Sequence, residues 1–121
     1  MNNKLKGTNF EREVCDILSK KGYWVHFLSP DARGAQPFDV IAVKDGEAFV
    51  ADCKTCDYAI FPLTRLEDNQ INAFGKWVRC GNPEPVILVK HFFDIYAIPY
   101  SKLMKEKRIR LEALDASYRW E

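Results

Sequence analysis

Apolar and polar residues alternate along residues 38–54, FDVIAVKDGEAFVADCK, and this pattern predicts a β-hairpin. The pair Asp45 and Gly46 lies at its centre. A type I′ turn needs positive φ at both central residues, and Asp-Gly tolerates this conformation. A two-residue turn at this point pairs Lys44 with Glu47, and that pair fixes the register of both strands.

The predicted register brings three charged side chains to one face. Asp39 faces Asp52 across the two strands, and Lys54 shares their face because side chains alternate along a strand. Like charges directly opposed at roughly 5 Å are destabilising. A divalent cation between the two carboxylates is the simplest reason to keep them. The alternative is a surface ion pair of Asp52 and Lys54 beside a solvated Asp39, worth ~0–1 kcal/mol.

Helical spacing of apolar residues on either side of the hairpin predicts two amphipathic helices. Residues 8–11 (TNFE) match a capping box, and the first helix then runs to a stop at Lys21-Gly22. Residues 64–67 (TRLE) match a second capping box. The predicted inner face of the second helix consists of Leu66, Gln70, Ala73, Phe74, Trp77 and Val78. Gln70 is the only polar member, and spacing leaves open whether it lies at the edge of the core or projects into the hairpin site.

The remaining pattern completes an α/β fold. A β-rich run at 23–28 predicts a buried strand, and the turn-rich loop 29–37 carries Arg33 and Gln36 close to the charged face. Two further strands at 85–90 and 93–98 precede a short basic helix, and the tail after residue 107 has no clear pattern. The order predicts a mixed central sheet flanked by helices, with an α-β-β-β-α-β-β core.

The length of 121 residues fits a single domain spanning residues 1–121. A net charge of +1 gives no global basic signature, so contact with nucleic acid would depend on local patches. The candidates are Lys4, Lys6, Arg12, Lys20 and Lys21 near one end and Lys102, Lys105, Lys107, Arg108 and Arg110 near the other. The alternative is an ordinary solvated surface. No apolar run has the ~20 residues of a membrane span, and no signal peptide is evident, so we expect a cytoplasmic protein.

The four cysteines include a CxxC at Cys53 and Cys56. A redox CxxC belongs at a helix N-terminus, whereas Cys53 lies in a predicted strand. No second CxxC or His pair completes a zinc set. We therefore expect reduced, partly buried thiols.

The predicted charged face has the outline of a phosphodiester-hydrolysis site. Asp39 and Asp52 can hold Mg²⁺ through oxygen ligands while leaving room for water and a phosphate. Lys54 can orient the attacking water or neutralise charge that builds on the phosphate.

These residues resemble a known signature. Asp39, twelve intervening residues and Asp52-Cys53-Lys54 look like the D-(x)n-(D/E)-x-K motif of the PD-(D/E)XK nuclease superfamily, which has a restriction-endonuclease-like fold. The resemblance to RecU-type Holliday junction resolvases is more specific and covers about residues 6–103. The opening KG…ERE block is also similar to archaeal Hjc-type resolvases. The matching blocks are Lys6-Gly7, Phe10-Glu11-Arg12-Glu13, Phe61-Pro62-Leu63, Asn69-Gln70-Ile71 and Ile98-Pro99-Tyr100-Ser101-Lys102-Leu103.

The resemblance implies a homodimeric, Mg²⁺-dependent endonuclease of DNA recombination and repair, in which Mn²⁺ substitutes for Mg²⁺. It would nick two opposing strands of a four-way DNA junction. The implied catalytic residues are Glu11, Asp39, Asp52, Lys54 and Gln70, of which Glu11, Asp39 and Asp52 would bind the metal. The implied DNA contacts are Lys4, Lys6, Arg12 and Arg33. Helical geometry does not choose between Glu11 and Glu13, and Glu11 is preferred because it follows Gly7 by four residues as in the family pattern.

Two departures from the family pattern leave alternatives open. Asp52 stands where these resolvases usually have Glu, and the nine residues 29–37 replace the region where RecU carries a junction-binding stalk. This compact version suggests a phage or prophage protein. The alternatives are another PD-(D/E)XK nuclease of the nicking, flap or restriction type, and a non-catalytic DNA-binding module of the same fold. Exposed aromatic residues could form the dimer interface, with Trp77, Phe92, Tyr118 and Trp120 as candidates.

Overall fold

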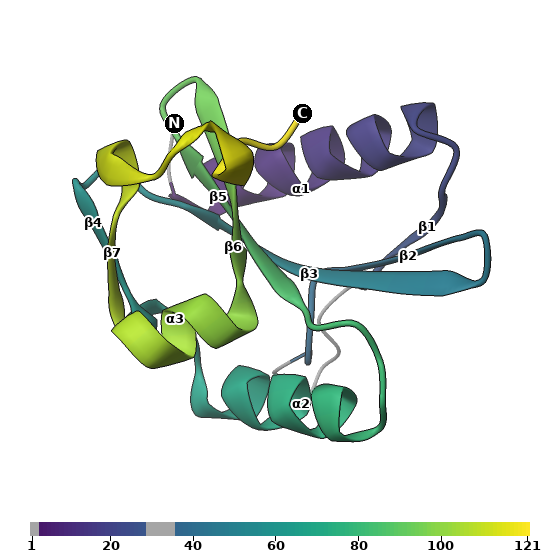
Figure 1. Cartoon of the computed structure of the whole chain (residues 1–121). Helices are drawn as coiled ribbons and strands as arrows, with labels where there is room; N and C mark the ends of the chain where they lie inside the picture. Colours follow the sequence, from purple (N-terminus) through teal and green to yellow (C-terminus); the bar gives the residue numbers. More distant parts are fainter. Residues whose placement is uncertain (1–2, 29–35) are drawn as a thin grey trace.

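The fold is a mixed five-stranded sheet between helices (Figure 1). The computed structural model describes the backbone of residues 3–28 and 36–121, and their side chains except those of residues 3–5 and 8. The strand order is β1-β2-β3-β5-β6, in which β3 and β5 are parallel and the other neighbours are antiparallel. The predicted fold class is confirmed. The helices and strands are α1 (Asn3–Lys20), β1 (Trp24–Phe27), β2 (Val40–Lys44), β3 (Glu47–Thr55), β4 (Ile60–Pro62), α2 (Asp68–Arg79), β5 (Val86–His91), β6 (Asp94–Pro99), α3 (Tyr100–Glu106) and β7 (Arg108–Arg110).

The hairpin of β2 and β3 has the predicted register. Lys44 pairs with Glu47, and the turn residues Asp45 and Gly46 have φ values of 53° and 81°. Both values are positive, as the predicted turn requires. Asp39 lies just before β2, and its backbone N–H donates to the carbonyl of Ala51 at 3.0 Å. Local turn chemistry therefore sets the alignment of the strands that carry the candidate site.

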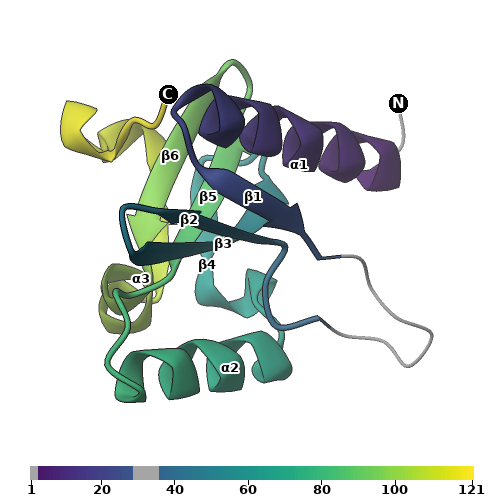
Figure 2. The same cartoon turned by 90° about the vertical axis from the view of Figure 1, so that its right-hand side faces the viewer.

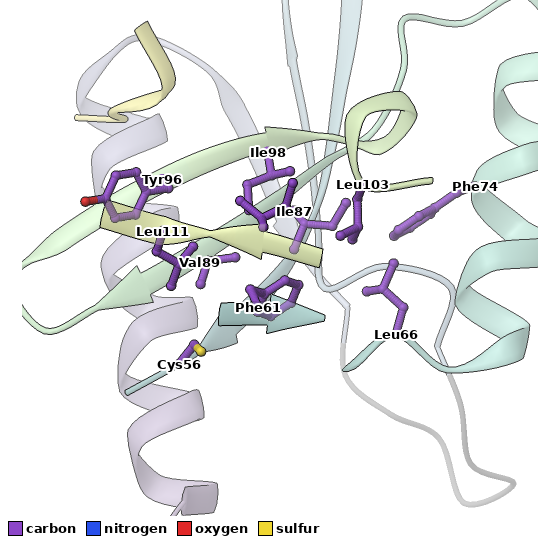
Figure 3. Close-up of a cluster of buried hydrophobic side chains, with 11 residues drawn as sticks. Cys56, Phe61, Leu66, Phe74, Ile87, Val89, Tyr96, Ile98, Leu103 and Leu111 are labelled. Carbon is purple, nitrogen blue, oxygen red and sulfur yellow. The ribbon is translucent and has the colours of Figure 1, made fainter. Parts of the chain in front are cut away.

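The two long helices cover opposite faces of the sheet, as Figure 2 shows with α1 on one side and α2 on the other. Phe10, Val14 and Leu18 follow helical spacing on α1 and are buried against residues of β2 and β3. Phe74 of α2 belongs to a second core cluster. Figure 3 shows that side chains of β4, β5, β6 and α3 meet in this second cluster.

Both predicted capping boxes are wrong. The first helix begins at Asn3, so residues 8–11 lie inside it. The second helix begins at Asp68 with Glu67 as its N-cap, because residues 63–65 form a 3₁₀ turn and Leu66 is extended and buried in the core. The backbone N–H of Glu67 donates to Oε1 of Gln70 at 3.0 Å, which places Gln70 in the first turn of α2.

The expectation that residues 23–28 form a buried strand is also wrong. Strand β1 is an edge strand that pairs only with β2, and Trp24 is 62% exposed. Val25 packs against the core under α1, whereas Trp24 and His26 point away from it and stack on each other. An apolar run can thus belong to an exposed edge when only one of its faces is covered.

The C-terminal tail contributes a strand that the sequence pattern did not identify. Strand β7 pairs antiparallel with β4, with Phe61 opposite Ile109. Ile109 is buried between the exposed Arg108 and Arg110, which is the alternation expected of a half-buried strand, and Leu111, directly after the strand, is buried too. This small second sheet closes the core cluster of Figure 3.

All four cysteines are free, as expected, and Cys53 and Cys56 are buried. Burial and nearby carboxylates raise the pKa of the Cys53 thiol, so this side chain is an inert part of the core. In the described part of the chain, no helix has the length and apolar character needed to cross a membrane.

Candidate active site

The charged face of the hairpin is a cluster of buried polar side chains, and it lies where the chain enters β2. Asp39 is only 6% exposed, and both of its carboxylate oxygens accept hydrogen bonds. Oδ2 accepts from the backbone N–H of Cys53 at 2.7 Å, and Oδ1 accepts from Nε2 of Gln36 at 2.5 Å. Strand β3 thereby holds the Asp39 carboxylate in place. The sequence placed Gln36 near this face but gave no sign that it contacts Asp39 directly.

Asp52 is fully buried at the centre of the cluster. Its Oδ1 accepts a hydrogen bond from Nε2 of Gln70 at 2.7 Å. Its Oδ2 lies 3.2 Å from Nζ of Lys54 but accepts no well-formed hydrogen bond from any described residue. One buried carboxylate oxygen is therefore left with a cation beside it and capacity for a further ligand.

Gln70 links the cluster to α2. Its Oε1 accepts from the Glu67 backbone at the start of the helix, and its Nε2 donates to Asp52. Of the two positions that spacing left open, the structure has the one in which Gln70 projects into the hairpin site. Gln70 therefore contributes both to the cap of α2 and to the orientation of the Asp52 carboxylate.

Glu11 and Glu13 have different partners in the structure. Oε1 of Glu13 forms an ion pair with Nζ of Lys90 at 2.5 Å. Glu11 instead lies near Asp39, and its pKa is raised to about 7 by partial burial and by the negative charge of Asp39, partly offset by Lys54. Helix α1 thus brings a third carboxylate to the cluster.

The carboxylates of the cluster disfavour one another's ionisation. The pKa of Asp52 is raised to about 8, first by burial and then by the charge of Asp39, while Lys54 acts in the opposite direction. Titratable groups shifted in this way concentrate at functional sites. A bound cation would reverse the shifts because it stabilises the ionised form of each carboxylate.

The donor set fits a hard divalent cation. Glu11, Asp39 and Asp52 offer carboxylate oxygens, the ligands that Mg²⁺ prefers, and Oδ2 of Asp52 has ligand capacity to spare. Among the described residues, no group of three or more Asp, Glu, His or Cys side chains is arranged to hold a metal ion as the structure stands.

The residues predicted to contact DNA lie on α1 or outside the described part of the chain. Lys6 pairs with Asp57 at 2.8 Å, and Arg12 is exposed on α1. Arg33 and the side chain of Lys4 lie outside the described residues. In the C-terminal basic patch, Lys102 pairs with Glu106 on α3.

We expect the metal-free protein to lose stability as the pH rises from about 5.5 to about 8.5. The raised pKa values of Asp52 and Glu11 mean that the folded state binds more protons than the unfolded state between pH ~4 and ~8. The free energy of unfolding therefore falls as these protons are lost. The melting temperature in EDTA should drop by on the order of 5 °C across this range, and Mg²⁺ should restore it at the upper end. If the difference in melting temperature between the wild type and Glu11→Gln were the same at every pH, Glu11 would not contribute to this loss of stability.

Comparison with known proteins gives matches of three kinds, to a family model, to a curated protein and to solved structures. A family model described as "Archaeal holliday junction resolvase (hjc)" matches residues 2–116. A crossover junction endodeoxyribonuclease Hjc of Methanocaldococcus jannaschii is 30% identical over 71 residues, which are 59% of this chain and 50% of that protein. The chain thus matches about half the length of that curated relative. The structure of Archaeoglobus fulgidus Hjc, a Holliday junction resolvase, aligns with a TM-score of 0.61 and 19% identity over 78% of this chain and 72% of the other, a likeness of fold.

Proposed function

The chain belongs to the archaeal Holliday junction resolvase (Hjc) family, and from this premise we propose that it is a metal-dependent endonuclease that resolves four-way DNA junctions. The observation that carries the proposal is the convergence of Asp39, Asp52, Lys54 and Gln70 in one buried cluster, with an oxygen of Asp52 left free to bind a ligand. Two buried carboxylates that repel each other, as Asp39 and Asp52 do, would add little to the stability of the sheet, so stability alone does not explain the cluster.

Glu11, Asp39 and Asp52 would hold Mg²⁺, or Mn²⁺ in its place. A divalent ion in such a site polarises the phosphodiester and lowers the pKa of a bound water. The protein itself fixes the ligands: Cys53 N–H orients Asp39, and Gln70 orients Asp52. Gln70 already donates to Oδ1 of Asp52, so Oδ2, which accepts no hydrogen bond from a described residue, is the oxygen with more capacity for a further ligand.

Lys54 would act on the phosphate side of the reaction. Its side chain is 19% exposed, so its ammonium group can contact both the buried Asp52 and a bound strand. A fixed cation at this position would neutralise charge that develops on the phosphate and would orient the attacking water. Its positive charge lowers the pKa of Asp52 against the effects of burial and Asp39, and so favours the ionised carboxylate that would bind the metal.

We propose that the active form is a homodimer, because two symmetric incisions need two sites and one chain carries one cluster. Of the four aromatic residues predicted for the interface, Trp77 packs on Phe38 and Trp120 stacks on Phe49. Tyr118 packs against the second core cluster, whereas Phe92 is 59% exposed and adjoins the fully exposed Phe93. The turn between β5 and β6 is therefore the better candidate interface. A monomer by sedimentation at micromolar concentration would contradict the dimer.

The test of the proposed function is cleavage of matched DNA substrates in Mg²⁺. A four-way junction, a flap and a linear duplex with the same arm sequence should be compared at equal enzyme concentration. We expect paired nicks on opposing strands of the junction and at least ~10-fold slower cleavage of the duplex. Equal cleavage of junction and duplex would instead identify a nuclease of the nicking or restriction type. Binding of DNA without any cleavage would identify a binding module.

A further inference from the structure

A groove of about 540 Å³ opens beside Lys54, on the side of the site that faces the start of α1. Lys6 and Gly7 line one wall, and the chain after β3, with Asp57 and Tyr58, lines the other. Arg65, in the 3₁₀ turn before α2, completes the lining. We propose that this groove binds the sugar–phosphate backbone of the DNA strand next to the cleaved bond, with Arg65 as a phosphate contact. This inference rests on the proposed nuclease function.

The charge of the groove suits a phosphate backbone. Among the described residues that line it are three basic side chains, those of Lys6, Lys54 and Arg65, and one carboxylate, that of Asp57. The whole chain has a net charge of only +1. The local excess of positive charge is therefore a property of this groove and not of the surface in general.

Arg65 is held in position by the strand that carries the catalytic lysine. Its Nη2 donates to the carbonyl of Thr55, the residue after Lys54, at 2.9 Å, and its guanidinium carbon lies 5.5 Å from the ring centroid of Phe61. A guanidinium has five N–H donors, and this bond uses one of them. A rigidly held arginine next to Lys54 can therefore bind a neighbouring phosphate in a bidentate manner with little further loss of side-chain freedom.

Tyr58 supplies an apolar surface at the edge of the groove. This residue is 78% exposed to solvent. A flat exposed ring beside a row of cations is the arrangement with which proteins hold nucleic-acid strands, because the ring packs on a base or sugar while the cations meet the phosphates.

The ion pair between Lys6 and Asp57 makes the electrostatic argument testable in both directions. The side chains of Lys6 and Asp57 are 39% and 53% exposed, and Nζ of Lys6 lies 2.8 Å from Oδ2 of Asp57 on the opposite wall of the groove. Asp57→Asn removes the only carboxylate among the described lining residues and breaks the ion pair that holds Lys6, so it should strengthen DNA binding. Arg65→Gln should weaken it. Glu106→Gln is the matched control, because it makes the same charge change as Asp57→Asn in an exposed ion pair on α3.

The experiment measures DNA binding as a function of salt in an Asp39→Asn background, which should not cleave. Arg65→Gln should weaken junction binding about 5- to 10-fold at 100 mM salt and reduce the slope of log K against log salt by about 0.7–0.9. Arg65→Lys should keep most of the slope. Asp57→Asn should tighten binding about 2- to 5-fold, and Glu106→Gln should change it by less than about 2-fold. Tyr58→Ala should weaken binding about 5-fold, whereas Tyr58→Phe should not.

A scan with single methylphosphonate linkages identifies the phosphate that Arg65 contacts. A neutral linkage next to the cleaved bond should weaken binding of the parent protein but have little further effect on Arg65→Gln. Unchanged binding, slope and methylphosphonate pattern in a folded Arg65→Gln protein would overturn the inference, even if the wild type cleaves junctions. Failure of the wild type to cleave any DNA would instead count against the proposed function, whatever the groove variants do.

Discussion

The Asp52→Asn variant is expected to lose DNA cleavage by about 10³-fold and yet to melt at a higher temperature than the wild type in the absence of metal. Asp52 is fully buried, and burial and Asp39 raise its pKa to about 8. Its ionisation therefore opposes folding at pH 8.5, and an asparagine removes that cost. The amide oxygen of asparagine can still accept the hydrogen bond that Gln70 donates.

The two effects have separate measurements. Single-turnover cleavage of a four-way junction in Mg²⁺ reports the first, and thermal unfolding in EDTA at pH 8.5 reports the second. We expect stabilisation of about 1–2 kcal/mol, which corresponds to a rise of several degrees in melting temperature. An asparagine at the exposed Asp16 of α1 serves as the control and should change neither quantity. A lower melting temperature for Asp52→Asn would mean that the ionised carboxylate stabilises the fold, contrary to the electrostatics of the cluster.

The hairpin could be predicted from sequence because its determinants are local. Asp45 and Gly46 set the turn, the turn sets the register, and the register brings Asp39 and Asp52 together. Strand alternation then adds Lys54 without further information. The part of the site built on this hairpin was therefore accessible from residue types and spacing alone.

The rest of the site depends on contacts between distant segments, which spacing cannot specify. Glu13 is removed from the site by an ion pair with Lys90, 77 residues away, and this leaves Glu11 beside Asp39. The start of α2 depends on burial of Leu66, which forces an extended residue where the sequence pattern predicted helix. Gln70 consequently lies in the first turn of the helix, where it can bond to both Glu67 and Asp52.

The same limit explains the errors at the edges of the fold. Strands β4 and β7 have three residues each and are stabilised by each other and by the core that they close. Neither has enough residues to give a periodic signal of its own. Arg65 follows β4 in the 3₁₀ turn, so its place beside Lys54 could not be predicted before the path of β4 was known.

Lys54→Met is expected to reduce the rate of junction cleavage by about 10²- to 10³-fold at saturating DNA. The variant removes the cation that lies 3.2 Å from Oδ2 of Asp52 and is exposed enough to contact a bound phosphate. Methionine has a side chain of similar length, so the loss should come from the charge and not from a cavity. The rate should be measured in single turnovers, because Lys54 also lines the groove with Arg65 and its loss will weaken binding.

The pH dependence of the residual activity distinguishes this role from a purely structural one. Lys54 lowers the pKa of Asp52 against the effects of burial and Asp39. Without the lysine that pKa rises further, so the carboxylate stays protonated to higher pH and metal binding requires a higher pH. The pH–rate profile of Lys54→Met should therefore shift upward relative to the wild type, and Lys54→Arg should shift it less because it keeps the charge. A profile that is merely lower at every pH, without a shift, would mean that Lys54 acts on the phosphate alone and does not control the ionisation of Asp52.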